Sequence, residues 1–162
     1  MLIFTVMNRT SKSISITHLT LFKEQLLMWA QQFEEIIWLD SNNYNYQNYP
    51  EYDAILAVDA FTSLKTDFQG AFDQLEEYQN TIKDWIFGYL SYDLKNDTER
   101  LTSKNDDNLH FADLYFFQPK KLFLIKNNTL ELHYLGMVDD EIEEDIDAIY
   151  ACLLYTSPSP RD

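Results

Sequence analysis

Apolar residues recur at three- and four-residue steps in three stretches of the chain, a spacing typical of amphipathic helices. The pattern predicts helices over residues 19–33, over residues 67–79 and from about Asp139 onward. Acidic side chains crowd the start of the last helix, where they complement the positive end of its dipole. The apolar positions that define the three faces are Leu19, Phe22, Leu26, Trp29 and Phe33, then Phe68, Phe72, Leu75 and Tyr78, then Ile142, Ile146 and Ile149.

The remaining apolar runs are short or alternate with polar residues, which predicts the strands of a mostly antiparallel sheet. The predicted strands are residues 13–17, 36–39, 53–58, 85–94, 114–117, 122–125 and 130–134. We interpret the aromatic run 85–94 as the central strand, and Gly88 inside it indicates close approach of another backbone. Asn127 and Asn128 can adopt the positive φ of a tight hairpin. The pattern therefore predicts one α+β domain with two to three helices packed on the sheet.

Residues 152–162, with the sequence CLLYTSPSPRD, share neither the acidity nor the apolar spacing of the preceding chain. They resemble a transposase-type sequencing-library adapter translated in frame, so we exclude them from the fold prediction. We expect residues 1–151 to be an amino-terminal domain whose natural continuation is missing from the sequence.

The net charge of -15 argues against binding to nucleic acid or to an anionic membrane, because a polyanion would repel the chain. The only cysteine, Cys152, falls in the excluded segment, so thiol chemistry is not expected. No apolar run reaches the roughly 18 residues of a membrane span. These observations predict a cytoplasmic protein.

Several kinds of site are excluded by composition and spacing. Three glycines, at positions 70, 88 and 136, cannot build a phosphate-binding loop. The histidines His18, His110 and His133 have no partner at metal-ligand spacing. The acidic run 139–147 lacks the turn glycine and alternating ligands of an EF-hand. The sequence therefore predicts no metal site and no catalytic residue in this chain.

One segment suggests a ligand site. The run Leu39–Asp40–Ser41 ends a predicted strand and precedes four tyrosines, at positions 44, 46, 49 and 52. Polar groups beside flat aromatic faces suit a small planar ligand, and packing of a structural loop is the alternative. In the run 88–93, phenol and carboxylate groups lie close together, and we interpret them as a buried hydrogen-bonded pair that fixes the sheet.

The segment 87–94, with the sequence FGYLSYDL, resembles the Gly-Tyr-x-Ser-Tyr-Asp stretch of the amino-terminal domain of chorismate-utilising enzymes. These are the component I subunits of aminodeoxychorismate and anthranilate synthases. The order of neighbouring segments also agrees, because Leu39–Asp40–Ser41 falls where the family has Leu-Glu-Ser, and the strand 53–58 and the hairpin 117–134 follow. The resemblance covers residues 13–150 and implies a partial domain of a larger two-layer α/β enzyme.

The resemblance implies that the parent enzyme uses Mg²⁺ to convert chorismate and ammonia into 4-amino-4-deoxychorismate or anthranilate. The ammonia comes from a glutamine amidotransferase subunit. In this family the catalytic and magnesium-binding residues lie in a carboxyl-terminal domain, so a chain without that domain is expected to be inactive alone. By position, Leu39, Asp40 and Ser41 become the candidates for binding tryptophan or a similar effector.

Asp40 differs from the family's Glu by one methylene, and a charge-assisted hydrogen bond weakens quickly outside its narrow distance range. This difference favours the p-aminobenzoate branch. The leading hypothesis is therefore the scaffold and effector-binding domain of an aminodeoxychorismate synthase component I, in folate biosynthesis. The alternatives are the corresponding domain of anthranilate synthase component I, in tryptophan biosynthesis, a pure ligand-binding module, and an acidic interaction domain without a small ligand.

Overall fold

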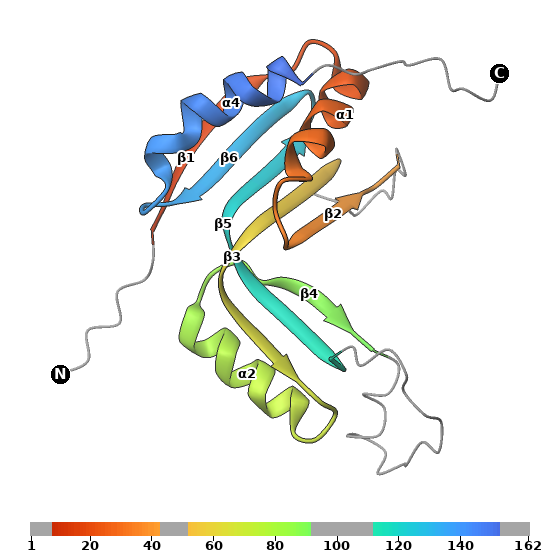
Figure 1. Cartoon of the computed structure of the whole chain (residues 1–162), viewed down its shortest axis with the longest axis vertical. Coiled ribbons are helices and arrows are strands. Elements are labelled where there is room, and N and C mark those ends of the chain that lie inside the picture. Colours follow the sequence, from red (N-terminus) through yellow and green to blue (C-terminus); the bar gives the residue numbers. More distant parts are fainter. Residues whose placement is uncertain (1–7, 43–51, 92–111, 153–162) are drawn as a thin grey trace. The chain divides into compact units, whose positions relative to one another are not determined.

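The computed structural model describes residues 8–42, 52–91 and 112–152. Their fold is α+β, with a six-stranded antiparallel sheet and three α-helices, as the sequence predicts (Figure 1). The strand order is β1-β6-β5-β3-β2, and β4 pairs with β5 off this path. The elements are β1 (Arg9–Ser15), α1 (Leu19–Ala30), β2 (Ile36–Asp40), β3 (Ala54–Thr66), α2 (Ala71–Ile82), β4 (Phe87–Leu90), β5 (Leu114–Lys126), β6 (Thr129–Leu135), the 3₁₀ turn η2 (Asp139–Glu141) and α4 (Ile142–Ala151). No helix in these three ranges combines the length and apolar character that a membrane span requires.

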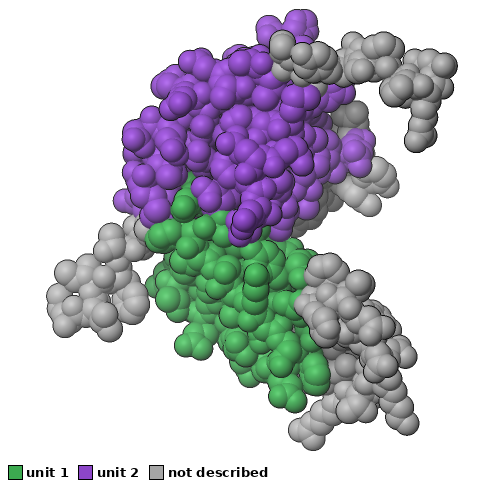
Figure 2. Space-filling model, viewed as in Figure 1, with its two compact units in different colours: residues 1–7, 60–120 green, residues 8–59, 121–162 purple. Residues whose placement is uncertain are grey.

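The chain divides into two compact units, which Figure 2 shows in different colours. The described part of unit 1 is residues 60–91 and 112–120, and that of unit 2 is residues 8–42, 52–59 and 121–152. Strands β3 and β5 each contain 13 residues and contribute to both units. The apolar pattern did not predict this division, because the same two strands belong to both units.

Unit 2 contains a large apolar core in which α1 and α4 pack against one face of the sheet (Figure 1). The two helices also contact each other, since the rings of Phe22 and Tyr150 lie 5.3 Å apart. Each helix contributes the apolar face that its spacing predicts. The buried residues of this core are Ile16, Phe22, Leu26, Trp29, Ala30, Ala54, Leu56, Val58, Phe123, Ile125, Leu130, Leu132, Tyr134, Ile142, Ile146 and Ile149.

Unit 1 contains α2 and the strand segments around β4. The cluster beneath α2 is small, with Ala71 and Leu114 buried and four apolar residues partly buried around them, namely Leu64, Phe68, Leu75 and Phe116. Strand β4 approaches β5 closely at Gly88, where an added Cβ would lie 1.8 Å from the backbone oxygen of Tyr115. The close backbone approach predicted at Gly88 is confirmed.

Strands β5 and β6 form the predicted hairpin. Asn127 and Asn128 have φ values of 50° and 59°, as a two-residue turn of this kind requires. A carboxylate oxygen of Asp53 accepts a hydrogen bond from the backbone N–H of Asn127 at 2.9 Å. The turn is therefore fixed both by its own backbone preference and by a neighbouring side chain.

The predicted arrangement around β4 and β5 is wrong in two respects. Residues 114–117 and 122–125 belong to one long strand, because Pro119 is accommodated where β5 changes partner. Residues 114–117 pair with β4, whereas residues 121–126 pair with β6. Proline can occupy a strand where no ladder hydrogen bond from its nitrogen is needed. In the described chain β4 pairs with β5 alone, so β5, between β6 and β3, is the central strand.

Other element boundaries differ from the sequence pattern. Strand β3 continues to Thr66 instead of ending at Val58, and it passes through Asp59 with a φ of 66°. Strand β1 is Arg9–Ser15 instead of residues 13–17. It lies at the edge of the sheet, where a strand can be mostly polar, so its first residues lack the apolar alternation on which the prediction relied.

Helix α1 ends at Ala30, three residues before Phe33, although Phe33 still packs against the core. Helix α2 begins at Ala71 because the Asp67 carboxylate accepts the Gln69 N–H in a turn, and Gly70 follows with a φ of 65°. It ends at Ile82, where Lys83 takes a φ of 50°. The Asp67 carboxylate therefore stabilises a turn before the helix and does not cap the helix itself.

Candidate functional site

The predicted effector residues lie at the end of β2, and they do not all share one face of the sheet. Ile36 and Trp38 pack against the core beneath α1. Because side chains alternate along a strand, Asp40 lies on that same face and Leu39 on the opposite one. Leu39 is 51% exposed. The structure therefore separates Leu39 from Asp40 as possible contacts for a single small ligand.

The carboxylate of Asp40 is paired with a cation from α1. The Lys23 ammonium lies 3.4 Å from Oδ1 and 3.3 Å from Oδ2, and the two side chains are only 18% and 20% exposed. Oδ1 also accepts the backbone N–H of Asn42 at 2.8 Å, and Asn42 itself has a positive φ of 53°. Asp40 thus orders the end of β2 and carries a charge that Lys23 balances.

Ser41 continues the pairing of β2 with β3 by one residue, since its N–H donates to the Asp53 carbonyl oxygen at 2.9 Å. Tyr52 precedes Asp53 and is half-buried. Of the four tyrosines predicted for this segment, Tyr52 is the one that the structure describes. Tyr44, Tyr46 and Tyr49 lie outside the described residues. Asp40, Ser41 and Tyr52 thus belong to the same end of the β2–β3 pair.

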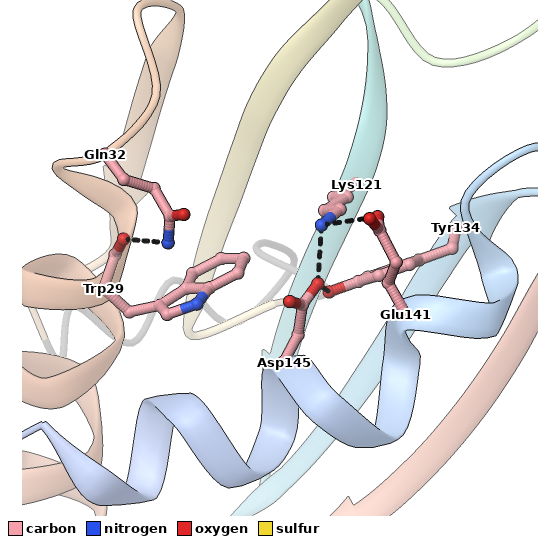
Figure 3. A network of polar contacts seen from close by, with 6 residues as sticks. All are labelled: Trp29, Gln32, Lys121, Tyr134, Glu141 and Asp145. Carbon is pink, nitrogen blue, oxygen red and sulfur yellow. Dashed lines mark hydrogen bonds and ion pairs between the residues drawn. The ribbon is translucent and has the colours of Figure 1, made fainter.

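A second polar cluster, which the sequence reasoning missed, lies inside unit 2 (Figure 3). The Lys121 side chain is 6% exposed, and its ammonium contacts the carboxylates of Asp145 at 2.6 Å and Glu141 at 3.1 Å. The Tyr134 hydroxyl donates to the same Asp145 oxygen at 2.7 Å. Strands β5 and β6 are thereby joined to η2 and the first turns of α4. We call these four residues the Lys121 cluster.

Three aromatic rings lie near the Lys121 ammonium. The centroids of the Trp29, Phe33 and Tyr134 rings lie 5.6, 5.5 and 5.3 Å from Nζ. Trp29 projects from α1 toward the lysine (Figure 3). A sequence signal for this site did exist, because Lys121 shares a strand face with Phe123 and Ile125 and so interrupts an otherwise apolar alternation. A cation at such a position calls for acidic partners.

The environment of the Lys121 cluster changes its proton affinities. Burial acts to lower the pKa of Lys121, but the hydrogen bonds and charges of Asp145 and Glu141 outweigh burial and raise the pKa above 10.5. Burial, together with the hydrogen bond and charge of Asp145 and the charge of Glu141, also raises the pKa of Tyr134. Lysine therefore stays charged and tyrosine stays neutral around neutral pH, which maintains the attraction within the cluster.

Unit 1 contains a smaller polar network beneath α2. The hydroxyls of Thr62 and Tyr78 lie 2.7 Å apart, Thr62 donates to the Gln118 side-chain oxygen at 3.1 Å, and the Gln118 amide donates to Asp84 at 2.8 Å. Burial raises the pKa of Tyr78, opposed by its hydrogen bonds and aided by the charge of Asp84. This network connects β3, α2 and β5 within unit 1.

Among residues 8–42, 52–91 and 112–152, no group of three or more His, Cys, Asp or Glu side chains is placed to hold a metal ion. His18 is exposed, and the His133 ring nitrogen lies 3.1 Å from Glu131. The third histidine, His110, lies outside the described residues, as do Tyr92, Asp93 and residues 153–162.

No protein-family model matches the sequence, and the search of curated proteins found no match.

Proposed function

We propose that this chain is the amino-terminal, non-catalytic domain of a chorismate-utilising enzyme, an aminodeoxychorismate synthase component I. In this role it is a scaffold and an effector-binding domain. The order of elements supports the proposal, because a helix and a strand ending in Leu39–Asp40–Ser41 come first. The next strand, the segment with Gly88 and the hairpin then follow in the order that the resemblance implies.

The observation that carries the effector-binding part is the Asp40–Lys23 pair at the end of β2. A carboxylate and an ammonium group 3.3 Å apart have the charges that the two ends of an amino-acid zwitterion require. Both groups keep some exposure, so a ligand can reach them. The half-buried ring of Tyr52 at the same strand end suits an aromatic side chain. Tryptophan, or a similar aromatic amino acid, is the ligand proposed for this position.

The remaining features of the proposal belong to the whole enzyme. Chorismate conversion, Mg²⁺ binding and the contact with a glutamine amidotransferase subunit are assigned to an enzyme that includes a carboxyl-terminal catalytic domain. A cytoplasmic location in folate biosynthesis is part of the same proposal. We expect this chain alone to leave chorismate unchanged in the presence of ammonia and Mg²⁺, and turnover by the purified chain would contradict its scaffold role.

Calorimetry with L-tryptophan tests the effector site. We expect binding by the unmodified chain and an affinity lower by roughly tenfold or more in Asp40→Asn, because a charged hydrogen-bond partner is lost. Asp147→Asn on the exposed side of α4 is the matched control and should bind as the unmodified chain does. No heat at millimolar tryptophan, with the protein folded, would overturn the effector role.

A further inference from the structure

The surroundings of the Lys121 ammonium have the composition of a ligand site. Three aromatic rings, those of Trp29, Phe33 and Tyr134, lie within 5.3 to 5.6 Å of Nζ. On another side lie two carboxylates, at 2.6 Å and 3.1 Å. Aromatic faces combined with carboxylates attract organic cations, through the ring quadrupole and through charge-assisted hydrogen bonds.

The contacts of this site suit a primary ammonium on an aliphatic chain. The charge-assisted contacts to Asp145 and Glu141 require N–H donors, and the lysine stem lies on the core face of β5 next to Phe123. Asp145 is 14% exposed, and one of its oxygens contacts both the Lys121 ammonium and the Tyr134 hydroxyl. We propose that Trp29, Phe33, Tyr134, Glu141 and Asp145 form an alkylammonium-binding site, and that Lys121 is the ligand that the chain itself supplies. This proposal is independent of the proposed enzyme family.

The proposal has a consequence that a simple salt bridge does not have. Lys121→Ala removes the ammonium and most of the stem, which leaves a mostly buried Asp145 without its cationic partner, although the Tyr134 hydroxyl still donates to it. A free alkylammonium of about the length of the lysine side chain can then restore both the charge pairing and the apolar contact. A ligand that binds only the folded state raises its melting temperature as its concentration rises.

Thermal melting of Lys121→Ala with and without butylammonium tests the proposal. We expect the substitution to lower Tm by on the order of 10 °C, because one partner of a buried ion pair is removed. Butylammonium at tens of millimolar should raise the Tm of this variant with a saturating dependence on concentration. Neutral butanol should not, and neither compound should raise the Tm of the unmodified chain. The exposed Lys126→Ala is the matched control and should show no rescue.

Equal effects of butylammonium on Lys121→Ala and on the unmodified chain would overturn the proposal. If Lys121→Ala is unfolded in buffer, recovery of its far-ultraviolet circular dichroism by butylammonium replaces Tm as the measurement, and no recovery contradicts the site. The double variant Lys121→Ala/Asp145→Asn adds a second test. It should lose the preference for butylammonium over butanol, and a retained preference would contradict the assigned role of Asp145.

Discussion

Helices α1 and α2 each contain 12 residues and each lie on an antiparallel sheet, but they bury very different surfaces. Helix α1 in unit 2 buries Phe22, Leu26, Trp29 and Ala30, whereas α2 in unit 1 buries only Ala71. Burial of apolar surface is the main favourable contribution to folding. The difference indicates that the core of unit 2 contributes most of the stability, and that burial of apolar surface stabilises α2 less than α1.

The polar contacts of unit 2 also lie beside a larger apolar core than those of unit 1. In unit 2 the Lys121 cluster lies at the edge of a large apolar core, to which Tyr134 itself belongs. In unit 1 the network of Thr62, Tyr78 and Gln118 lies beside a cluster with two buried residues. A neutral hydrogen bond contributes only about 0.5–1.5 kcal/mol net. We therefore expect the segments around α2 to open at lower free energy than the core of unit 2.

The largest expected effect is that of truncating a core phenylalanine in unit 2. Phe123 is fully buried and its ring lies 5.4 Å from that of Trp29 and 5.8 Å from that of Tyr134. Phe123→Ala should lower the free energy of unfolding by about 3–5 kcal/mol. The matched variant in unit 1 is Phe116→Ala, at a partly buried site, and its loss should be smaller. Urea denaturation measures both, and a larger loss for Phe116→Ala would break the comparison.

Next in size is the loss expected when Gly88 gains a side chain. In Gly88→Ala the new Cβ would clash with the backbone of β5, so the β4–β5 pairing must separate. We expect a cost of about 2–3 kcal/mol, confined to unit 1. Hydrogen exchange should become faster in residues 87–90 and 114–117. The control is Gly136→Ala, where an added Cβ meets nothing within 4 Å, and it should leave exchange unchanged.

Alkaline pH should weaken unit 2 through the Lys121 cluster. The folded-state pKa values of Lys121 and Tyr134 are raised, so the folded state holds these protons more strongly than the unfolded chain. The resulting stability is complete below about pH 10 and is lost as pH rises through the folded-state values. The slope of the unfolding free energy against pH should reach at most about 1.4 kcal/mol per pH unit for each group. Denaturant titrations at several pH values between about 9 and 11 measure this slope.

Tyr134→Phe is the control for this slope and should flatten it by removing one of the two titrating groups. An unchanged slope would contradict the assignment. Tyr78 in unit 1 also has a raised pKa, so Tyr78→Phe identifies any part of the slope that comes from α2.

A smaller effect is expected when Tyr78 loses its hydroxyl. Tyr78→Phe breaks the 2.7 Å contact with Thr62 and should cost about 0.5–1.5 kcal/mol. The loss should increase hydrogen exchange in α2 while the exchange of β6 stays unchanged. Thr81→Ala, on the exposed side of the same helix, is the comparison variant. Faster exchange of β6 in Tyr78→Phe would show that α2 is not an independent opening segment.

The smallest effect is expected for an exposed ion pair. Lys12 in β1 contacts Glu143 in α4, and both side chains are largely accessible to solvent. Lys12→Ala should change the free energy of unfolding by no more than about 0.5 kcal/mol, in contrast to the buried Lys121. Thermal melting measures both variants under one set of conditions. A Lys12→Ala loss equal to that of Lys121→Ala would remove the distinction between exposed and buried pairs.

The sequence predicts elements whose signals are local. The helix faces of α1 and α4, the turn at Asn127 and Asn128, and the close approach at Gly88 were all predicted from spacing or from single-residue backbone preferences. Strand order and strand length were not predicted, because they depend on partners far away in the chain. Residues 114–117 and 122–125 show this well, since they were predicted as two strands but form one strand that exchanges β4 for β6 around Pro119.

The candidate site was predicted less well than the fold. The position of Leu39–Asp40–Ser41 at a strand end was predicted, but strand alternation separates Leu39 from Asp40, and Lys23 was not anticipated as the partner of Asp40. The pairing needs α1 to lie over β2, a tertiary arrangement without a local signal. The Lys121 cluster was missed although Lys121 interrupts an apolar strand face, because that local signal does not say which residues of β6, η2 and α4 become its partners.

Hydrogen exchange along β5 tests the difference between the two units most directly, because one strand contributes to both. The amides of residues 121–126 pair with β6 above the large core, and those of residues 114–117 pair with the four-residue strand β4. We predict that the first group exchanges only through global unfolding and the second through openings of lower free energy. Equal protection in both halves of β5, or slower exchange in residues 114–117, would contradict the account.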